Sequence, residues 1–345
     1  MRKLIILFGG QSYEHEISIV SAISLHKAIA AQCAFVFLSP DRRFYLIDLI
    51  DMKAEYFANG RYRKSVELFL ARGGFERKTL FGRTPIDGDV VVSVAHGADG
   101  EDGKLAALFE FYGVNYVGPR LEASALSFNK LFTKFLAAAA GVKTLPYQTI
   151  RRGDTITIAY PFIVKPLRLG SSIGVSVAKD ESDLSYAIDM AFEFDDEAIV
   201  EPFIADVLEY NLAGCKTADG WRLSAIEQPQ KKELLDFEQK YLDFARDGKV
   251  KEAALPSETA EALREAFRKI YSQGFDGALI RCDFFVLDGE VVLNEINPIP
   301  GSLANYLFDD YETTLNALID SLPRSREIAV TYNYIRSIRS AKGKL

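Results

Sequence analysis

The sequence predicts an α/β protein of two or three domains. Short continuous apolar runs end at glycines, as buried parallel strands do, and stretches with helical apolar spacing follow them. The chain has 345 residues, which at about 150 residues per domain is enough for two or three cores. An apolar content of 48% and the absence of a recurring 20–50-residue period exclude a disordered chain and a repeat array.

The first region opens with a strand, a glycine turn and a helix. Residues 4–8 form a continuous apolar run that stops at Gly9 and Gly10, and residues 17–29 carry apolar side chains in a helical rhythm. A second buried strand, a helix and a short strand are expected over residues 90–95, 105–112 and 114–117. The breakers Gly118 and Pro119 then mark the first domain boundary.

The second region begins with an alanine-rich helix predicted over residues 124–140 and stopped by Gly141. Strands over 162–165 and 175–178 flank a loop of small residues, which predicts a hairpin. A helix over 184–192 and an extended segment over 198–200 follow, and the second boundary falls at Glu201 and Pro202.

The third region is predicted to contain strands near residues 210–215 and 222–227, a helix over 259–271 and a strand pair around Asp288 and Gly289. The long charged segment between these strands and the helix, about residues 230–256, is more typical of a functional lid than of a linker. The basic tail, residues 334–345, is predicted to be a solvated terminal helix.

Charge and cysteine content narrow the class of protein. The chain has 41 Lys and Arg against 48 Asp and Glu, a net charge of −7, which argues against a nucleic-acid partner and leaves room for a local basic pocket. Three cysteines, Cys33, Cys215 and Cys282, indicate a reducing compartment. The apolar runs are shorter than the ~20 residues of a membrane span, and the first breaks too soon for a signal peptide. We therefore expect a soluble cytoplasmic protein without a membrane partner.

The strand pair around Asp288 and Gly289 carries two carboxylates whose relative position depends on the loop length. A three-residue loop places Asp283 beside Glu295, and Arg281 beside Asn297, all on one face. A two-residue loop sends the two carboxylates to opposite faces. On one face, two carboxylates and an amide oxygen suit a hard cation such as Mg²⁺ held against phosphate; an ordinary edge hairpin with solvated charges is the alternative.

A second candidate site is Lys165, which ends an apolar strand before the small-residue loop 168–174. Glycines let backbone N–H groups approach an anion, and the lysine supplies a positive charge for phosphate. By itself the loop fits a phosphate site and a plain surface hairpin equally well. The chain contains neither a P-loop nor the glycine fingerprint of a dinucleotide-binding fold.

Six motifs in this order resemble those of one family, the ATP-grasp ligases, and within it the D-alanine–D-alanine ligases. They are LFGGQSYEHEIS (7–18), HGADGEDG (96–103), SFNK (127–130), VKP (164–166), QKYL (239–242) and NEIN with PG (294–297 and 300–301). The resemblance covers nearly the whole chain. It implies a three-domain ATP-grasp architecture: an N-terminal parallel-sheet domain (1–119), a central subdomain (120–202) and a C-terminal subdomain (203–345) with the lid. ATP would lie between the last two, and a homodimer would form through the N-terminal domain.

The resemblance also implies a reaction. ATP phosphorylates the carboxylate of one D-alanine, and the amine of a second D-alanine displaces phosphate from the acylphosphate, giving the dipeptide for peptidoglycan. Two Mg²⁺ or Mn²⁺ ions would be held by Asp283, Glu295 and Asn297. Arg281 and the Gly301 N–H match the donors to the tetrahedral oxyanion. The residues that match the ATP contacts are Lys130, Lys165, Lys240 and Ser172 for the phosphate end, Glu201 and Ile204 for adenine, and Glu209 for ribose.

For the amino acids, Glu14 matches the acceptor of the first substrate's ammonium and His96 the group near its carboxylate. Ser171 and Tyr241 match the residues that, with Glu14, hold the lid over the site. Residues matching the second-substrate pocket are Tyr306 and Leu307.

This chain departs from the family pattern at three positions. Leu167 and Leu169 replace a serine and a glutamate of the phosphate loop, and Tyr306 stands where relatives commonly have serine. The alternative activity is a ligase that takes D-lactate or another second substrate. Tyr241 favours D-alanine, because lactate-using relatives often carry phenylalanine there. A nucleotide-binding module without catalysis would lack one of the metal-binding or anchoring residues, and this chain has them all. A nicotinamide oxidoreductase would need the glycine fingerprint of a dinucleotide-binding fold, which the chain lacks.

Overall fold

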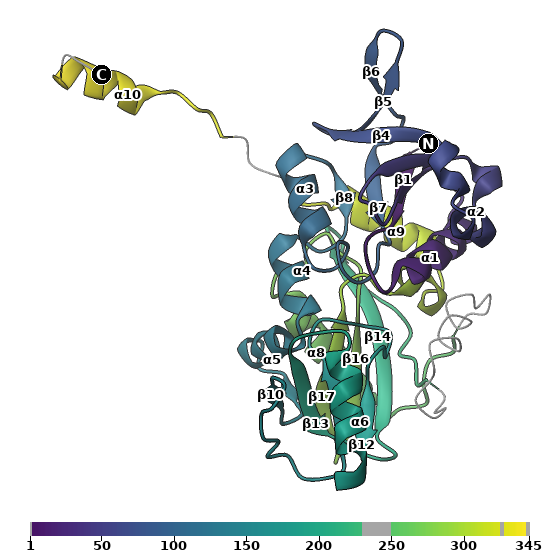
Figure 1. The fold of residues 1–345 in the computed structure, drawn as a ribbon, viewed down its shortest axis with the longest axis vertical. Helices are drawn as coiled ribbons and strands as arrows, with labels where there is room; N and C mark the ends of the chain where they lie inside the picture. Colours follow the sequence, from purple (N-terminus) through teal and green to yellow (C-terminus); the bar gives the residue numbers. More distant parts are fainter. Residues whose placement is uncertain (1, 230–249, 325–327, 343–345) are drawn as a thin grey trace.

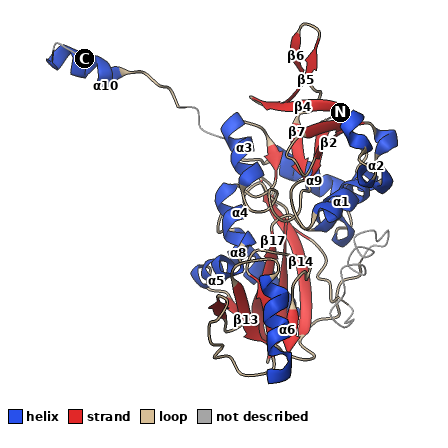
Figure 2. Ribbon diagram, viewed as in Figure 1, coloured by secondary structure: helices blue, strands red, loops and turns tan. Residues whose placement is uncertain are grey.

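A computed structural model describes residues 2–229, 250–324 and 328–342. It confirms the α/β class: helices pack on three separate sheets of eight, four and five strands (Figures 1 and 2). The eight-stranded sheet lies in one half of the molecule, and the four- and five-stranded sheets lie together in the other half.

The eight-stranded sheet has the order β6-β5-β4-β3-β2-β1-β7-β8. In its parallel part β1 pairs with β2 and β7, and β7 pairs with β8; of these strands β1, β7 and β8 were predicted and β2 was not. The bounds are β1 (Lys3–Gly9), β2 (Gln32–Leu38), β7 (Val90–Ser93) and β8 (Tyr116–Val117), with helices α1 (His15–Ala28) and α3 (Lys104–Tyr112). The burial of β1 from Leu4 to Gly9 explains its continuous apolar run.

An antiparallel extension of this sheet was not predicted. It consists of β3 (Phe44–Ile47), β4 (Val66–Ala71), β5 (Gly74–Thr79) and β6 (Gly82–Pro85), accompanied by η1 (Leu49–Asp51), α2 (Ala54–Ala58) and η2 (Arg61–Lys64). Strands β4, β5 and β6 are largely half-exposed or exposed and carry charged side chains, so they lack the continuous apolar pattern that identified the buried strands. Strand β3 is a short apolar run that sequence reasoning missed.

The four-stranded sheet has the order β10-β13-β11-β12. The predicted hairpin is confirmed, since β11 (Phe162–Pro166) pairs antiparallel with β12 (Ser176–Ala178); the other strands are β10 (Gln148–Ile150) and β13 (Ala198–Pro202), with α6 (Glu181–Phe192). The single helix predicted over 124–140 is wrong. It is two helices, α4 (Leu121–Phe128) and α5 (Lys130–Ala139), because extended Asn129 separates them and its side chain caps α5 by accepting from the Leu131 N–H.

The five-stranded sheet has the order β15-β14-β16-β17-β9. Its strands are β9 (Lys143–Thr144), β14 (Leu208–Thr217), β15 (Gly220–Leu223), β16 (Ile280–Leu287) and β17 (Glu290–Asn297), and α8 (Ser257–Tyr271) contacts them. Strand β9 comes from the stretch between α5 and β10, so the chain crosses to this sheet before it builds the four-stranded one.

The β16–β17 hairpin has the predicted pairing but reaches it differently. The loop has two residues, Asp288 and Gly289, both with positive φ (51° and 81°), as in a type I′ turn. A shift in register between Asp283 and Phe284 leaves Asn294 as an extra residue, so Asp283 pairs with Glu295. The predicted three-residue loop is therefore wrong. The β-bulge at Asn294 instead places Asp283 and Glu295 on the same face of the hairpin.

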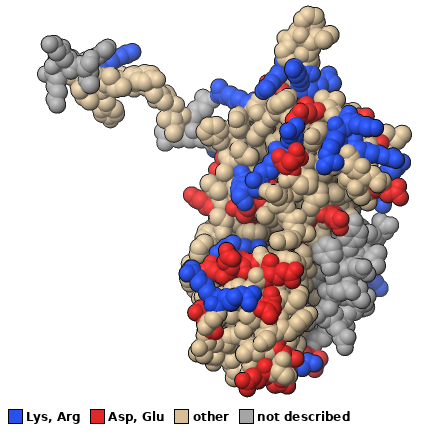
Figure 3. Space-filling view, in the orientation of Figure 1, with Lys and Arg blue, Asp and Glu red and all other residues tan. Residues whose placement is uncertain are grey.

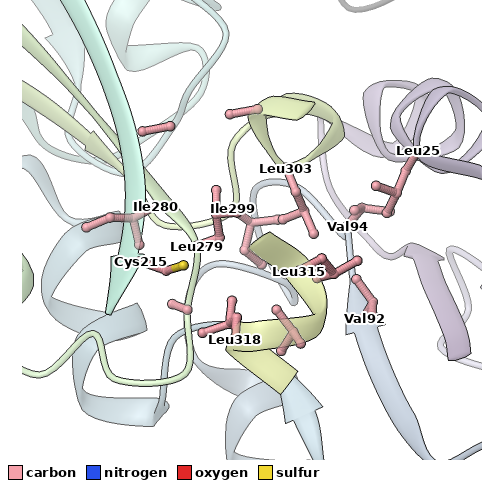
Figure 4. Packing of buried hydrophobic residues seen from close by; sticks show 14 of the residues in the cluster. Leu25, Val92, Val94, Cys215, Leu279, Ile280, Ile299, Leu303, Leu315 and Leu318 are labelled. Carbon is pink, nitrogen blue, oxygen red and sulfur yellow. The ribbon is translucent and has the colours of Figure 1, made fainter. Parts of the chain in front are cut away.

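One hydrophobic core joins the eight- and five-stranded sheets. Figure 4 shows Leu25 and Val92 of the first sheet region, Leu303 of η3 (Gly301–Leu307), Leu315 of α9 (Tyr311–Asp320), and Ile280 of β16 along one continuous cluster. The four-stranded sheet has a separate core of its own, formed with α6. The segment from η3 to α9 therefore packs the eight- and five-stranded sheets together, whereas the four-stranded sheet is a distinct packing unit.

Helix α10 (Asn333–Lys342) extends away from the body of the molecule, and its residues up to Ile338 are exposed (Figure 1). The structure thus agrees with a solvated terminal helix. On the face drawn in Figure 3, basic and acidic side chains are interspersed. In the described ranges, 2–229, 250–324 and 328–342, no helix is both long and apolar enough to cross a membrane.

We predict that Gly289→Ala destabilises the protein by about 1 kcal/mol, because alanine is strained at φ 81° although its Cβ would meet open space. Urea unfolding measures the change. Gly74→Ala is the control, since Gly74 also faces open space and does not have positive φ. An equal effect of both substitutions would contradict the turn assignment.

Candidate active site

A pocket between the four- and five-stranded sheets gathers half of the predicted ATP and metal residues. Its lining combines side chains from α5, β11, β13 and β17, together with the loop before α3: Glu101, Lys130, Lys134, Lys165, Glu201, Asn294, Glu295 and Asn297. Lys130 is the first residue of α5, and its ammonium donates to the Leu169 carbonyl of the small-residue loop. The two motifs that carried the phosphate prediction therefore lie together.

Glu201 lies at the back of this pocket between two lysines. Its Oε2 accepts from Lys165 Nζ at 2.7 Å, and its Oε1 accepts from the ammonium of Lys134. The Lys134 and Glu201 side chains are 3% and 2% exposed. Burial opposes ionisation of Glu201, but attraction to Lys165 and Lys134 outweighs it, so the pKa of this carboxyl is lowered. The pKa of Lys165 is raised, because Glu201 outweighs the burial of its ammonium.

The β16–β17 hairpin presents Arg281, Asp283, Glu295 and Asn297 on one face. Arg281 binds Asp283 in a bidentate manner, with Nε to Oδ1 at 2.7 Å and Nη2 to Oδ2 at 2.8 Å. The Asn297 amide also donates to Asp283 Oδ2, at 3.1 Å. Asp283 is therefore held in place before any cation arrives.

The donor set of this hairpin fits Mg²⁺ or Mn²⁺. Two carboxylates and an amide oxygen are hard oxygen donors, which these ions prefer. Among the described residues, no group of three or more Asp, Glu, His or Cys side chains could hold a metal. A cation here would need oxygens from phosphate or water as well, as Mg²⁺ commonly does.

Glu14 and Ser171 connect the N-terminal region to the small-residue loop. Ser171 Oγ donates to Glu14 Oε1 at 2.5 Å, while Glu14 Oε2 is buried without a hydrogen-bond partner among the described residues. Burial, followed by repulsion from Glu101, raises the pKa of Glu14. A Cβ on Gly170 would lie 2.9 Å from Glu14 Oε1, so a larger residue here would press on the carboxylate.

His96 is buried beside Glu14. Its Nε2 lies 2.7 Å from Ser21 Oγ, which also accepts the Ser302 N–H at 3.1 Å, and its Nδ1 lies 3.5 Å from Glu101 Oε1. Burial lowers the pKa of His96 to about 4 and raises that of Glu101 to about 8. At neutral pH this pair is therefore held largely uncharged in the interior.

The segment η3 places Gly301, Tyr306 and Leu307 next to the hairpin. Tyr306 OH accepts from Arg281 Nη1 at 3.3 Å, and the Leu307 carbonyl accepts the Ala225 N–H at 3.1 Å. Three consecutive residues of η3 after Gly301 have positive φ near 50°: Ser302, Leu303 and Ala304. Strained backbone of this kind collects at functional sites, and the sequence carried no sign of it.

The other predicted ATP residues do not line this pocket or lie outside the described residues. Ser172 has a positive φ of 57° in the small-residue loop, Ile204 follows β13 and Glu209 lies on β14, where its charge acts on Lys165. Lys240 and Tyr241 lie outside the residues that the structure describes, as do residues 230–249 of the predicted lid (about 230–256).

Comparison with known proteins identifies the family of this chain. A family described as D-ala D-ala ligase N-terminus matches residues 3–119, and D-ala D-ala ligase C-terminus matches residues 136–320. A D-alanine–D-alanine ligase from Campylobacter concisus is 58% identical, over 98% of both chains. The chain belongs to the D-alanine–D-alanine ligase family.

Solved structures of related ligases show the same ATP-grasp fold. The D-alanine–D-alanine ligase of Helicobacter pylori is 46% identical, with a TM-score of 0.84 over 94% of this chain and 100% of that one. A D-Ala:D-Ser ligase from Enterococcus faecalis is 24% identical, with a TM-score of 0.72 over 92% and 98%. The latter likeness concerns the fold alone.

Sequence reasoning missed four residues of this family member's site: Ser21, Glu101, Lys134 and Asn294. Glu101 stood inside a quoted motif without a role. Lys134 lies one helical turn after Lys130, so the i, i+4 spacing was an available signal that both lysines face the same way. Asn294 Oδ1 lies 3.4 Å from Lys165 Nζ, a contact that only the bulge position explains.

We predict that Glu101→Gln gains stability relative to the wild type as pH rises from 5 to 8. The unfolded chain ionises Glu101 near its ordinary pKa of 4.5 and the folded protein only at about 8, so the wild type loses stability across this window. The relative gain should be about 3 to 4 kcal/mol, measured by chemical unfolding without metal or nucleotide. The exposed Glu122→Gln is the control; a difference independent of pH would contradict the burial argument.

Proposed function

We propose that this protein joins two D-alanines into D-alanyl-D-alanine at the expense of ATP, through an acylphosphate, releasing ADP and phosphate for peptidoglycan synthesis. The observation that carries the proposal is one pocket in which Lys130 and Lys165 meet Glu295 and Asn297, with Glu14 close by through Ser171. Phosphoryl transfer needs positioning and charge neutralisation, and this pocket offers both.

ATP would lie between the four- and five-stranded sheets. Lys130 and Lys165, joined by Lys240 and Ser172, would bind the phosphates, while Ile204 and Glu201 would bind adenine and Glu209 the ribose. The buried lysines support this proposal, since ammonium groups removed from water gain most from an anion.

Asp283, Glu295 and Asn297 would hold two Mg²⁺ or Mn²⁺ ions, which would neutralise charge that develops on the phosphates. The bidentate bond from Arg281 keeps Asp283 oriented, and the same guanidinium, with the Gly301 N–H, would stabilise the oxyanion of the tetrahedral intermediate.

The first D-alanine would bind between Glu14 and His96. The unpaired Glu14 Oε2 is an acceptor for its ammonium, and this supports the assignment because a buried carboxylate oxygen without a donor is costly. Ser171 would hold the carboxylate in place, and Tyr241 would join it when the lid covers the site. A covered site protects the acylphosphate from water.

The second substrate would bind against Tyr306 and Leu307. The Tyr306 hydroxyl accepts a hydrogen bond from Arg281, the proposed oxyanion donor. It therefore lies farther from its own backbone than the hydroxyl of a serine at this position would. This observation supports a second candidate, in which D-lactate or another small nucleophile replaces the second D-alanine. The ligase from Enterococcus faecalis, named for D-Ser, has the same fold.

We further propose a division into residues 1–119, 120–202 and 203–345, a cytoplasmic location and a homodimer. Exposed apolar side chains support the dimer. They lie on α3, α4 and α5, which follow one another along one side of the molecule in Figure 1: Leu108, Phe111, Leu121, Leu126, Phe132 and Phe135. A second copy of the chain would cover this surface, beginning at α3 of the N-terminal region.

With ATP, Mg²⁺ and an equimolar mixture of D-alanine and D-lactate, we expect D-alanyl-D-alanine as the main product, with one phosphate released per product. Mass spectrometry identifies the product. Glu295→Ala should lower turnover at least about a thousandfold while the circular dichroism spectrum is retained, because a metal ligand is lost. Depsipeptide as the main product would favour the second candidate, and no phosphate release above background would refute both.

We predict that Phe111→Glu converts the dimer to a monomer. The Phe111 side chain is 83% exposed in the single chain, and a carboxylate there could not be buried against a second copy. Light scattering after size-exclusion chromatography measures the mass. Leu80→Glu, at an equally exposed position of the β5–β6 turn, is the control; a monomeric wild type would contradict the dimer.

A further inference from the structure

Lys134 is a buried charge to which the proposed reaction gives no role. Its side chain is 3% exposed, and its ammonium binds Glu201 Oε1. Burial lowers the pKa of Lys134, with Glu201 opposing that effect. A buried ion pair is weak evidence for stability, because hydrophobic residues of the same size often stabilise a fold as well or better. Its position in the nucleotide pocket therefore calls for a functional explanation.

Two lysines, Lys134 and Lys165, donate to Glu201, and only Lys165 has a further proposed role. Lys165 also lies 3.4 Å from Asn294 Oδ1 and is the lysine proposed to bind phosphate. When Lys165 binds phosphate, Glu201 Oε2 loses a donor while the carboxylate stays buried. Lys134 would remain on Oε1 and keep the carboxylate both ionised and oriented. Without Lys134, Glu201 would be an uncompensated buried charge.

We propose that Lys134 is a positioning residue that sets the purine specificity of the site by holding Glu201 as an oriented acceptor. This inference rests on the proposed nucleotide site. With Oε1 occupied by Lys134, Oε2 is the oxygen left to accept from the 6-amino group of adenine. A 6-oxo purine such as hypoxanthine presents an acceptor there and is rejected, because two acceptors then face each other.

Binding of ADP and IDP, measured by titration calorimetry with Mg²⁺, tests the proposal. The two nucleotides carry the same phosphates, so the ratio of their dissociation constants isolates the purine contact. We expect Lys134→Met to weaken ADP about tenfold or more and IDP much less. Lys134→Arg keeps a positive charge at this position and should retain most of the preference for ADP. Lys143→Met, which removes an exposed ion pair with Glu290, should leave both constants unchanged.

Glu201→Gln tests the orientation directly. Because Lys134 donates only to an oxygen, it should hold the amide carbonyl at the Oε1 position and turn the NH₂ toward the base. The preference should then shift toward IDP. In Lys134→Met/Glu201→Gln the amide is free to turn over, and that shift should disappear. This double variant also removes both charges together, so it covers the case in which Lys134→Met alone fails to fold.

Equal weakening of ADP and IDP by Lys134→Met would overturn the proposal and assign Lys134 to phosphate or to the fold. The same purine preference in Glu201→Gln with and without Lys134 would also overturn it. Failure of the wild type to bind ADP at all would instead refute the proposed nucleotide site, so the two failures are distinguishable.

Discussion

The register of the β16–β17 hairpin is the constraint on which the rest of the site depends. One extra residue, Asn294, changes the parity of β17, so that Glu295 lies beside Asp283 instead of on the opposite face of the sheet. The same shift brings Asn297 beside Arg281 and gives Lys165 a contact with Asn294. A single local irregularity thus aligns the four residues of the hairpin that are proposed to hold the metal ions and the oxyanion, and it places Asn294 against Lys165.

Packing then decides which parts of the molecule hold together. A continuous core joins the eight-stranded sheet to the five-stranded sheet through η3 and α9, while the four-stranded sheet keeps its own core (Figure 4). The central sheet meets the rest of the site through polar contacts such as that of Ser171 with Glu14. Polar contacts across a domain boundary are easier to break and re-form than a buried apolar interface, which suits a site that must admit and then enclose its substrates.

Charge balance in the pocket differs from that of the whole chain. The net charge is −7, yet Lys130, Lys134 and Lys165 lie buried near Glu201 and Glu295. Removing these ammoniums from water is costly, and each is compensated by a carboxylate, a carbonyl oxygen or the anion that the pocket is proposed to bind. His96 and Glu101 avoid the same cost by remaining largely uncharged at neutral pH.

The sequence by itself determined the α/β class, most helices and several buried strands, and many of the residues proposed for the site, because burial and glycine turns leave periodic marks and the motifs carry the chemistry. Only the tertiary structure decided that Asn129 divides one expected helix into two, that a bulge rather than a longer loop aligns Asp283 with Glu295, and that Lys134 meets Glu201. The contact of Lys134 with Glu201 joins residues far apart in the chain, the bulge depends on one unpaired residue, and the cap at Asn129 is a local contact inside a continuous helical pattern. None of the three changes the apolar periodicity from which the elements were predicted.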